Sequence, residues 1–192
     1  MDPFEYVVVI TSLITGLGIA QILNGIADIV SDIKNIRLSA PLSLLILSTF
    51  LNLIQEWFYN YQYATHVTSW TLSTVLGVLI YPILLFLLAR MLFPTGLKSD
   101  VTDLDGYYFE QWKWFFWLSG SIILVSVFHD IFISGFTLQD QVLKLVLIAI
   151  HLTFLLFDVH NRKAHYVFQA MSVIGLIAFI VLTDNELVSY LP

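Results

Sequence analysis

Long apolar stretches separated by short polar connections make up most of this chain. Six of them lie at residues 4–30, 40–63, 70–93, 114–135, 142–160 and 165–183. Each reaches or nearly reaches the roughly 20 residues that an α-helix needs to cross about 30 Å of hydrocarbon. The fifth is the shortest and ends in FDVHNRK, so five spans are the alternative. The pattern predicts an all-α, polytopic bundle of six transmembrane helices in one domain, residues 1–192.

The basic residues fall mainly in alternate connections between these stretches. Of the eight Lys and Arg residues, all but Lys144 lie in or beside the first, third and fifth connections: Lys34, Arg37, Arg90, Lys98, Lys113, Arg162 and Lys163. The positive-inside rule makes those connections cytoplasmic, so we expect both termini outside. An aromatic belt should then mark the inner interface, formed by Tyr107, Tyr108, Trp112, Trp114 and Trp117.

Composition supports a membrane protein and excludes other classes. Hydrophobic residues are 58% of the chain and charged residues 11%, with a mean hydropathy of +0.86, which is too apolar for a water-soluble domain. The net charge of −6 and the scattered basic residues argue against nucleic acid as a partner. The absence of cysteine excludes disulfides and thiolate chemistry. We expect a bacterial cytoplasmic membrane, with the lipid bilayer as the main partner.

Polar residues recur every four positions along the second stretch. Ser48, Asn52, Glu56 and Asn60 share one face of a helix, and Gln55 lies beside it. Such a face cannot point into lipid, because polar groups are costly in hydrocarbon. It either forms interhelical hydrogen bonds that fix the packing or lines a pathway for a proton or solute.

The fourth stretch supplies possible partners for Glu56. His129 and Asp130 should lie at a similar depth in the outer third of the membrane. Together with Glu56 they could relay a proton, or bind a hard or borderline divalent cation. Neighbouring helical residues point about 100° apart, so His129 and Asp130 need not face the same point. A histidine held by interhelical hydrogen bonds is the simpler interpretation of His129.

The first stretch has two faces of small or polar residues. Ser12, Gly16 and Ala20 form a small-xxx-small pattern that favours close helix packing and a homo-oligomer, most simply a dimer. The other face consists of Gly18, Gln21, Gly25 and Asp28. It predicts either a glycine-based packing surface or an inner polar groove, with Arg90 as a possible partner of Asp28.

Cofactor motifs are weak. His129 and His151 could ligate one haem iron from neighbouring helices, but two histidines are too little to predict haem, and we expect no cofactor. Asp158, His160 and His165 lie beside Arg162 and Lys163, which is typical of a solvated turn at the headgroups. No nucleotide-binding or hydrolase motif occurs.

Several segments carry a resemblance to a known group. FEYVVVITSLITGLGIAQILNG, QEWFYNYQ, SWTL, RMLFP and YYFEQWKWFF together cover most of the chain. The chain resembles a widespread group of small, uncharacterised bacterial polytopic membrane proteins that begin with an acidic-aromatic pair and a Gly-Leu-Gly helix. The resemblance implies the fold and carries over no catalytic residue. Glu56 departs from the pattern, because an apolar or aromatic neighbour of Trp57 is expected there.

Two classes of function fit these patterns. The first is an oligomeric channel or transporter-like bundle for protons or small cations. The second is a non-transporting membrane sensor or scaffold in a multi-component stress or defence system, whose aromatic segment 94–117 contacts a cytoplasmic protein. An intramembrane enzyme or haem protein is the third interpretation.

Overall fold

The computed structural model describes residues 3–60, 63–67, 69–94 and 102–183. Its long helices are α1 (Pro3–Ser31), α2 (Ala40–Tyr59), α4 (Leu72–Met91), α5 (Leu104–Phe132), α6 (Val142–Leu156) and α7 (Arg162–Thr183). Shorter elements are η1 (Ile33–Asn35), β1 (Ile36–Arg37), α3 (Tyr63–His66), β2 (Thr102–Asp103) and η3 (Leu138–Gln141).

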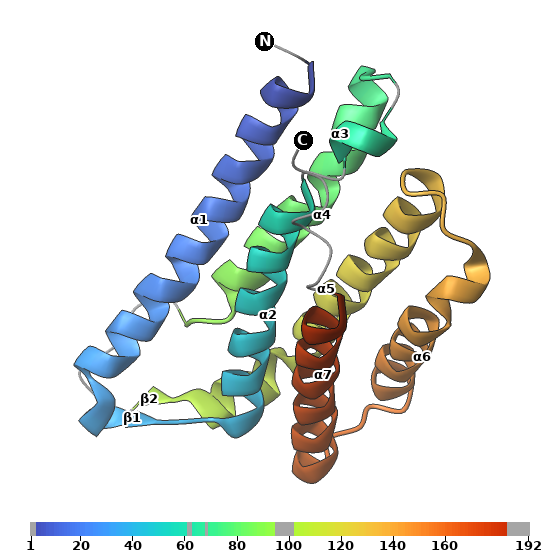
Figure 1. The fold of residues 1–192 in the computed structure, drawn as a ribbon. Helices are drawn as coiled ribbons and strands as arrows, with labels where there is room; N and C mark the ends of the chain where they lie inside the picture. Colours follow the sequence, from blue (N-terminus) through green and yellow to red (C-terminus); the bar gives the residue numbers. More distant parts are fainter. Residues whose placement is uncertain (1–2, 61–62, 68, 95–101, 184–192) are drawn as a thin grey trace.

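Six helices in the described part of the chain are long and apolar enough to cross a membrane, when η3 is counted with α6. This agrees with the six predicted spans and with an all-α bundle. The helices run alternately down and up in Figure 1, with α1 starting at the top and α7 running upward. The bundle therefore has two ends, and every connection lies at one or the other.

Polar side chains set the starts of the helices. Ser39 caps α2 by accepting from the backbone N–H of Leu42, and Thr71 caps α4 by accepting from Thr74. Asp103 accepts from the N–H of Asp105 at the start of α5. These caps satisfy N–H groups that have no partner within their helices.

Helix α5 begins ten residues earlier than the predicted span at residue 114. The predicted spans leave residues 94–113 as a connection between two helices. This was wrong from Leu104 onward, while residues 95–101 lie outside the described residues. Tyr108 and Trp112 face the protein core, with exposed fractions of 0% and 1%. They therefore cannot form part of an outward-facing belt, whereas Trp114 and Trp117 are exposed. Packing of these large rings against other helices explains why a segment with several charges is helical.

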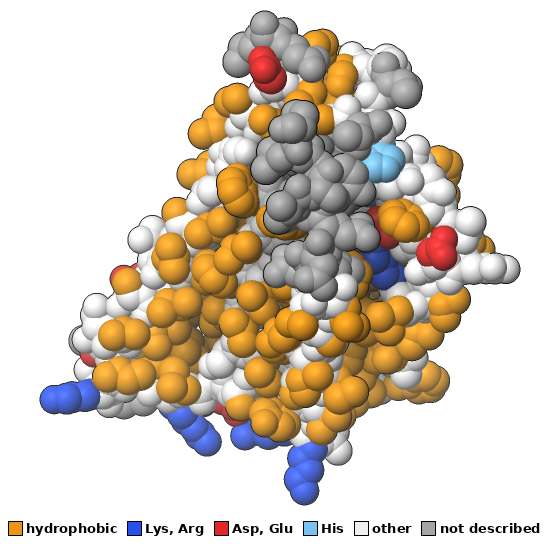
Figure 2. Space-filling model, in the orientation of Figure 1, with side chains coloured by type: hydrophobic (Ala, Val, Ile, Leu, Met, Phe, Trp, Pro, Cys, Tyr) orange, Lys and Arg blue, Asp and Glu red, His pale blue; other side chains and the backbone are white. Residues whose placement is uncertain are grey.

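The first, third and fifth connections meet at one end of the bundle, which we call the basic end. β1 pairs in parallel with β2, Ile36 opposite Thr102, and joins the first connection to the third. Ion pairs join α5 to the fifth connection and α7: Lys113 to Asp158 at 2.6 Å and Arg162 to Asp105 at 2.9 Å. Figure 2 shows Lys and Arg side chains gathered at this lower end, below a broad apolar surface.

Helix α2 is the central element, because it contacts α1, α4, α5 and α7. Helix α1 packs most extensively on α4, whereas α6 packs mainly on α5. The core toward the basic end is apolar and rich in aromatic rings, including Leu85, Leu92, Phe93, Trp112 and Phe115. The other half holds the buried polar residues Glu56 and Asn60.

Candidate functional site

The polar face of α2 divides into two parts with different hydrogen bonding. Ser48 donates to the carbonyl of Leu45, and Asn52 donates through Nδ2 to the carbonyl of Ser48 at 2.8 Å. These two residues are thus satisfied by their own helix. Glu56 and Asn60, one and two turns further on, are buried with exposed fractions of 6% and 2%.

Glu56 and Asn60 carry side-chain atoms without hydrogen-bond partners among the described residues. These atoms are Oε1 of Glu56 and both Nδ2 and Oδ1 of Asn60. Thr15 of α1, which is fully buried, adds an unpartnered Oγ1. We call Thr15, Glu56 and Asn60 the Glu56 cluster. Gln55 is only half-buried.

The register of α1 against α2 brings Thr15 and Glu56 to one level, with Asn60 one turn further along α2. Leu53 packs on Gly18, where an added Cβ would lie 2.9 Å from its Cδ2 atom. The two helices are antiparallel. Thr15 comes three residues before Gly18 on α1, and Glu56 comes three residues after Leu53 on α2. Thr15 therefore lies at the level of Glu56.

A surface hollow of about 330 Å³ adjoins the cluster and includes Asn60 in its wall. The remaining wall residues are Phe4, Val8, Ser12, Trp57 and Phe58.

His129 is hydrogen-bonded to groups outside the Glu56 cluster. Its Nε2 lies 2.9 Å from the carbonyl oxygen of Gly77, and its Nδ1 lies 3.1 Å from the hydroxyl of Tyr63. A carbonyl can only accept, so Nε2 carries the hydrogen, and the Tyr63 hydroxyl donates to Nδ1 of the neutral ring. Burial, and next the charge of Glu56, raise the pKa of Tyr63 above its ordinary range, so Tyr63 remains a donor. The ring of Tyr81 lies 6.0 Å from that of His129, measured between ring centroids.

Asp130 points to a different partner from its neighbour His129. Its Oδ2 lies 2.6 Å from Nζ of Lys144 on α6, and Lys144 also donates to Ser126 at 2.7 Å. No group of three or more His, Asp or Glu residues suited to a metal ion occurs among the residues that the structure describes. Glu56, His129 and Asp130 accordingly do not form a common ligand set.

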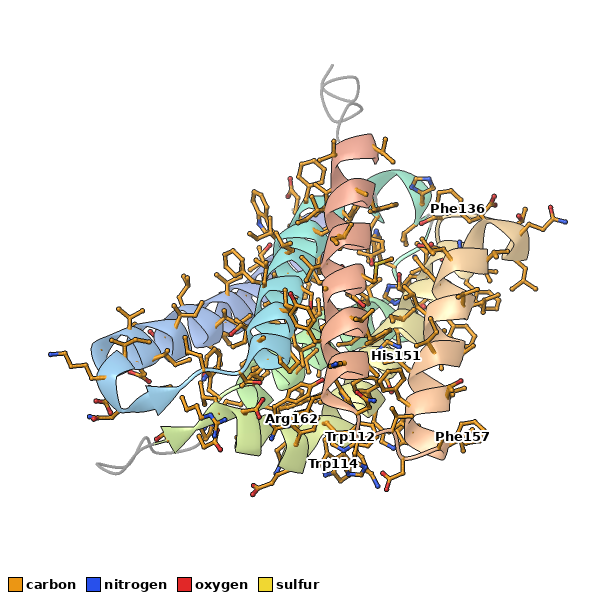
Figure 3. All side chains as sticks on the ribbon, turned by 90° about the horizontal axis from the view of Figure 1, so that it is seen from below. Trp112, Trp114, Phe136, His151, Phe157 and Arg162 are labelled. Carbon is orange, nitrogen blue, oxygen red and sulfur yellow. The ribbon has the colours of Figure 1, made fainter. Side chains whose placement is uncertain are left out.

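His151 lies in separate surroundings from His129. Its Nδ1 donates to the carbonyl of Leu147 at 2.7 Å, and its Nε2 lies 3.1 Å from Oγ of Ser119. The ring packs on Phe116 and Phe168, and Figure 3 shows it pointing into the space between α5, α6 and α7. The ring nitrogens of both histidines thus have protein partners.

The two faces of α1 have different surroundings. Gly18 and Gly25 are buried, and an added Cβ on Gly25 would overlap the ring of Phe93. On the other face, Gly16 and Ala20 are exposed, and nothing lies within 4 Å of a Cβ built on Gly16. The face that contains Gly18 and Gly25 is therefore filled by apolar side chains from neighbouring segments and does not form a polar groove.

The polar residues predicted at the inner end of α1 remain near the surface. Gln21 is half-buried, while Asp28 and Arg90 are exposed. No ion pair joins Asp28 to Arg90 in the described ranges.

Sequence reasoning missed a second buried histidine site at the basic end. His165 is fully buried, so placing it in a solvated turn was wrong, although Asp158 and His160 are exposed as expected. Its Nε2 donates to the carbonyl of Val159 at 2.7 Å, and its Nδ1 accepts from Tyr108 at 2.9 Å. The surrounding rings, here called the aromatic box, are Phe109, Trp112, Phe116 and Phe154. The density of aromatic residues in YYFEQWKWFF was the available signal.

The fold is therefore a helical bundle of the membrane-spanning type, with a buried polar cluster in one half and an aromatic core in the other. No protein-family model matches the chain, and neither a curated protein nor a solved structure shows detectable similarity to it.

Proposed function

We propose that this protein passes protons or small cations across a membrane through a polar site centred on Glu56. The Glu56 cluster supports the proposal, because it holds four buried side-chain atoms without partners among the described residues. Leaving one such atom unsatisfied costs about 1–3 kcal/mol. A proton, a cation or its hydrating water would meet these groups, and acidic lining favours cations over anions.

The packing between the cluster and the basic end corresponds to a closed conformation in this proposal. Leu53 fills the space over Gly18, and Phe93 fills the space over Gly25. Ile22 lies between these two contacts along α1 and is fully buried. Conduction would require Leu53 and Phe93 to move, while the cluster itself adjoins the hollow at the opposite end.

Flux measurements in liposomes that contain the purified protein test this proposal. We expect an imposed proton or alkali-cation gradient to dissipate faster than in empty liposomes. Glu56→Gln should reduce the rate to that of empty liposomes, because the neutral amide cannot carry the proton or charge. Phe93→Ala should raise the rate by removing the ring over Gly25. Glu110→Gln is the matched control, since Glu110 is exposed on α5.

A result without flux would favour the second function. If protons, alkali cations and chloride all cross at the rate of empty liposomes, the channel proposal fails and a non-transporting sensor or scaffold replaces it. The apolar contacts of Gly18 and Gly25 support that alternative. So do the exposed Trp114 and Trp117, which could meet a cytoplasmic protein. A photo-crosslinking residue at position 114 would then capture that partner.

Two further parts of the proposal concern assembly and orientation. Gly16 faces away from the bundle, so Gly16→Leu should weaken a homodimer without unfolding the monomer. The mass of the purified protein in mild detergent measures dimerisation. A wild-type protein that is monomeric there would contradict this part of the proposal. We also propose a bacterial cytoplasmic membrane with the basic end inside. Reporters fused after Lys34 and Lys163 should then read cytoplasmic.

A further inference from the structure

An open groove of about 450 Å³ lies at the basic end, where α2, α5 and α7 begin. Its walls are mainly apolar, with Ala40 and Pro41 on the side of α2 and Tyr166 and Val167 on the side of α7. Tyr166 and Val167 have exposed fractions of 50% and 56%. The groove thus lies at the end of the bundle, and its apolar wall continues along the exposed side of α7.

Three charged side chains line the same groove: Asp105, Arg162 and Lys163. Arg162 is held in place by Asp105, at 2.9 Å, and by the ring of Phe109, at 5.3 Å from its centroid. Lys163 forms no ion pair in the described part of the chain. Since Asp105 neutralises Arg162, Lys163 leaves the groove with one uncompensated positive charge.

The backbone at the start of α7 does not contribute a binding site for an anion. Oδ1 of Asn161 already accepts from the N–H groups of Lys163 and Ala164, at 2.9 and 3.3 Å. Anion recognition at this groove therefore depends on side chains. Arg162 keeps N–H groups beyond the one that faces Asp105, and its side chain is 68% exposed.

We propose that this groove binds one anionic phospholipid. The headgroup phosphate lies between Lys163 and Arg162, and an acyl chain follows Tyr166 and Val167 along α7. Basic pockets at the cytoplasmic ends of transmembrane helices recognise anionic headgroups in this way. The uncompensated Lys163 selects an anionic lipid over a zwitterionic one, and the apolar wall selects a lipid over a soluble phosphate. The proposal does not depend on ion flux through the Glu56 cluster.

Native mass spectrometry of the full chain, released from mild detergent, tests the proposal. Titration with phosphatidylglycerol should give a tightly retained adduct, whereas phosphatidylcholine should be retained less. Lys163→Gln should weaken the phosphatidylglycerol adduct about fivefold, the effect of one interfacial basic residue, and should change phosphatidylcholine little. Lys163→Gln leaves the pair between Arg162 and Asp105 intact, so the fold should be kept.

Two further variants separate the groove from general charge attraction. Lys34→Gln removes a positive charge at the same end but outside the groove, and it should leave the adduct unchanged. Val167→Trp should weaken binding of the lipid by filling the apolar wall. The proposal is overturned if the two lipids bind equally, or if Lys34→Gln acts as strongly as Lys163→Gln. Displacement by excess glycerol phosphate would also overturn it, since the ligand would then be a soluble phosphate ester.

Discussion

The two tyrosine–histidine pairs, one in each half of the bundle, have the same hydrogen bonds in different surroundings. At the basic end, Tyr108 donates to Nδ1 of His165, whose Nε2 donates to the Val159 carbonyl. At the opposite end, Tyr63 donates to Nδ1 of His129, whose Nε2 donates to the Gly77 carbonyl. Each pair joins helix α5 to another segment of the chain.

The neighbours of the two imidazoles decide what each can do. The aromatic box encloses His165, which has an exposed fraction of 0%. His129 is only half-buried, and its ring contacts Tyr63 and Tyr81, with Asp130 as the next residue of the helix. The first pair is a structural connection within an aromatic core. The second has the ionisable neighbours that proton transfer requires.

The largest effect should come from the aromatic box. Trp112→Ala removes a ring that is 1% exposed and contacts both His165 and Phe116. We expect it to lower the free energy of unfolding by about 3–5 kcal/mol, the usual cost of a buried aromatic truncation. Unfolding by denaturant in mild detergent measures the loss. Trp114→Ala is the control on the same helix, because Trp114 is 62% exposed and should change stability by less than about 0.5 kcal/mol. Equal losses of unfolding free energy in the two variants would contradict the assignment of Trp112, and not Trp114, to the packed aromatic core.

Removing one hydroxyl from each pair should have a smaller and unequal effect. Tyr108→Phe leaves Nδ1 of the enclosed His165 without its donor, at a cost of about 1–3 kcal/mol. Tyr63→Phe should cost no more than about 1 kcal/mol, because His129 is less enclosed and the bond is replaceable. The same unfolding assay compares them. A larger loss for Tyr63→Phe would reverse the roles assigned to the two pairs.

Nitrogen NMR of labelled histidine provides a test without mutation. His129 and His165 should both be neutral with the hydrogen on Nε2, since a carbonyl accepts from that atom in each. His151 should carry its hydrogen on Nδ1, where the Leu147 carbonyl accepts. Individual His→Gln variants assign the signals. Finding the Nδ1–H tautomer at His129 would contradict its bond to Gly77.

Acid should weaken the basic end through Asp158, by a small amount. The hydrogen bond from Lys113 holds the pKa of the Asp158 carboxyl below its ordinary value. A lowered folded-state pKa means that the stabilisation is present above the unfolded-state value and is lost as pH falls through the folded-state value. Asp158→Asn should therefore be slightly less stable than wild type at neutral pH and equal to it in strong acid. A difference that is independent of pH would assign the effect to backbone conformation instead.

The helices were predictable from sequence because each long apolar stretch fits the width of a membrane. The local polar patterns were less informative, since periodicity identifies a helix face without identifying its neighbour. Glu56 and Asn60 were expected inside the bundle, and they are buried there. The contact of His129 with Tyr63 and Gly77 depends on how α3, α4 and α5 meet, and no pattern in one helix specifies that.

Tyr108, Trp112 and His165 were predicted at the membrane interface, but they are buried in the protein core. Amphipathic rings are common both at membrane interfaces and in protein cores, so their positions near charged residues suggested an interface. Instead, Tyr108 and Trp112 of α5 both pack against His165 of α7. The glycines of α1 also required the fold, because only the position of Phe93 distinguishes Gly25 from the exposed Gly16.

The early start of α5 has a consequence for how this helix sits in a bilayer. Its 29 residues measure about 44 Å, well beyond the hydrocarbon thickness of about 30 Å. The charged residues of its first ten positions are Asp105, Glu110 and Lys113. Without those ten positions the helix measures about 28 Å, which matches the hydrocarbon. The lengths therefore match a membrane span that is extended by a rigid, charged stalk of about 15 Å. With that stalk in the headgroup layer, the excess length would need neither strong tilt nor local thickening of the bilayer.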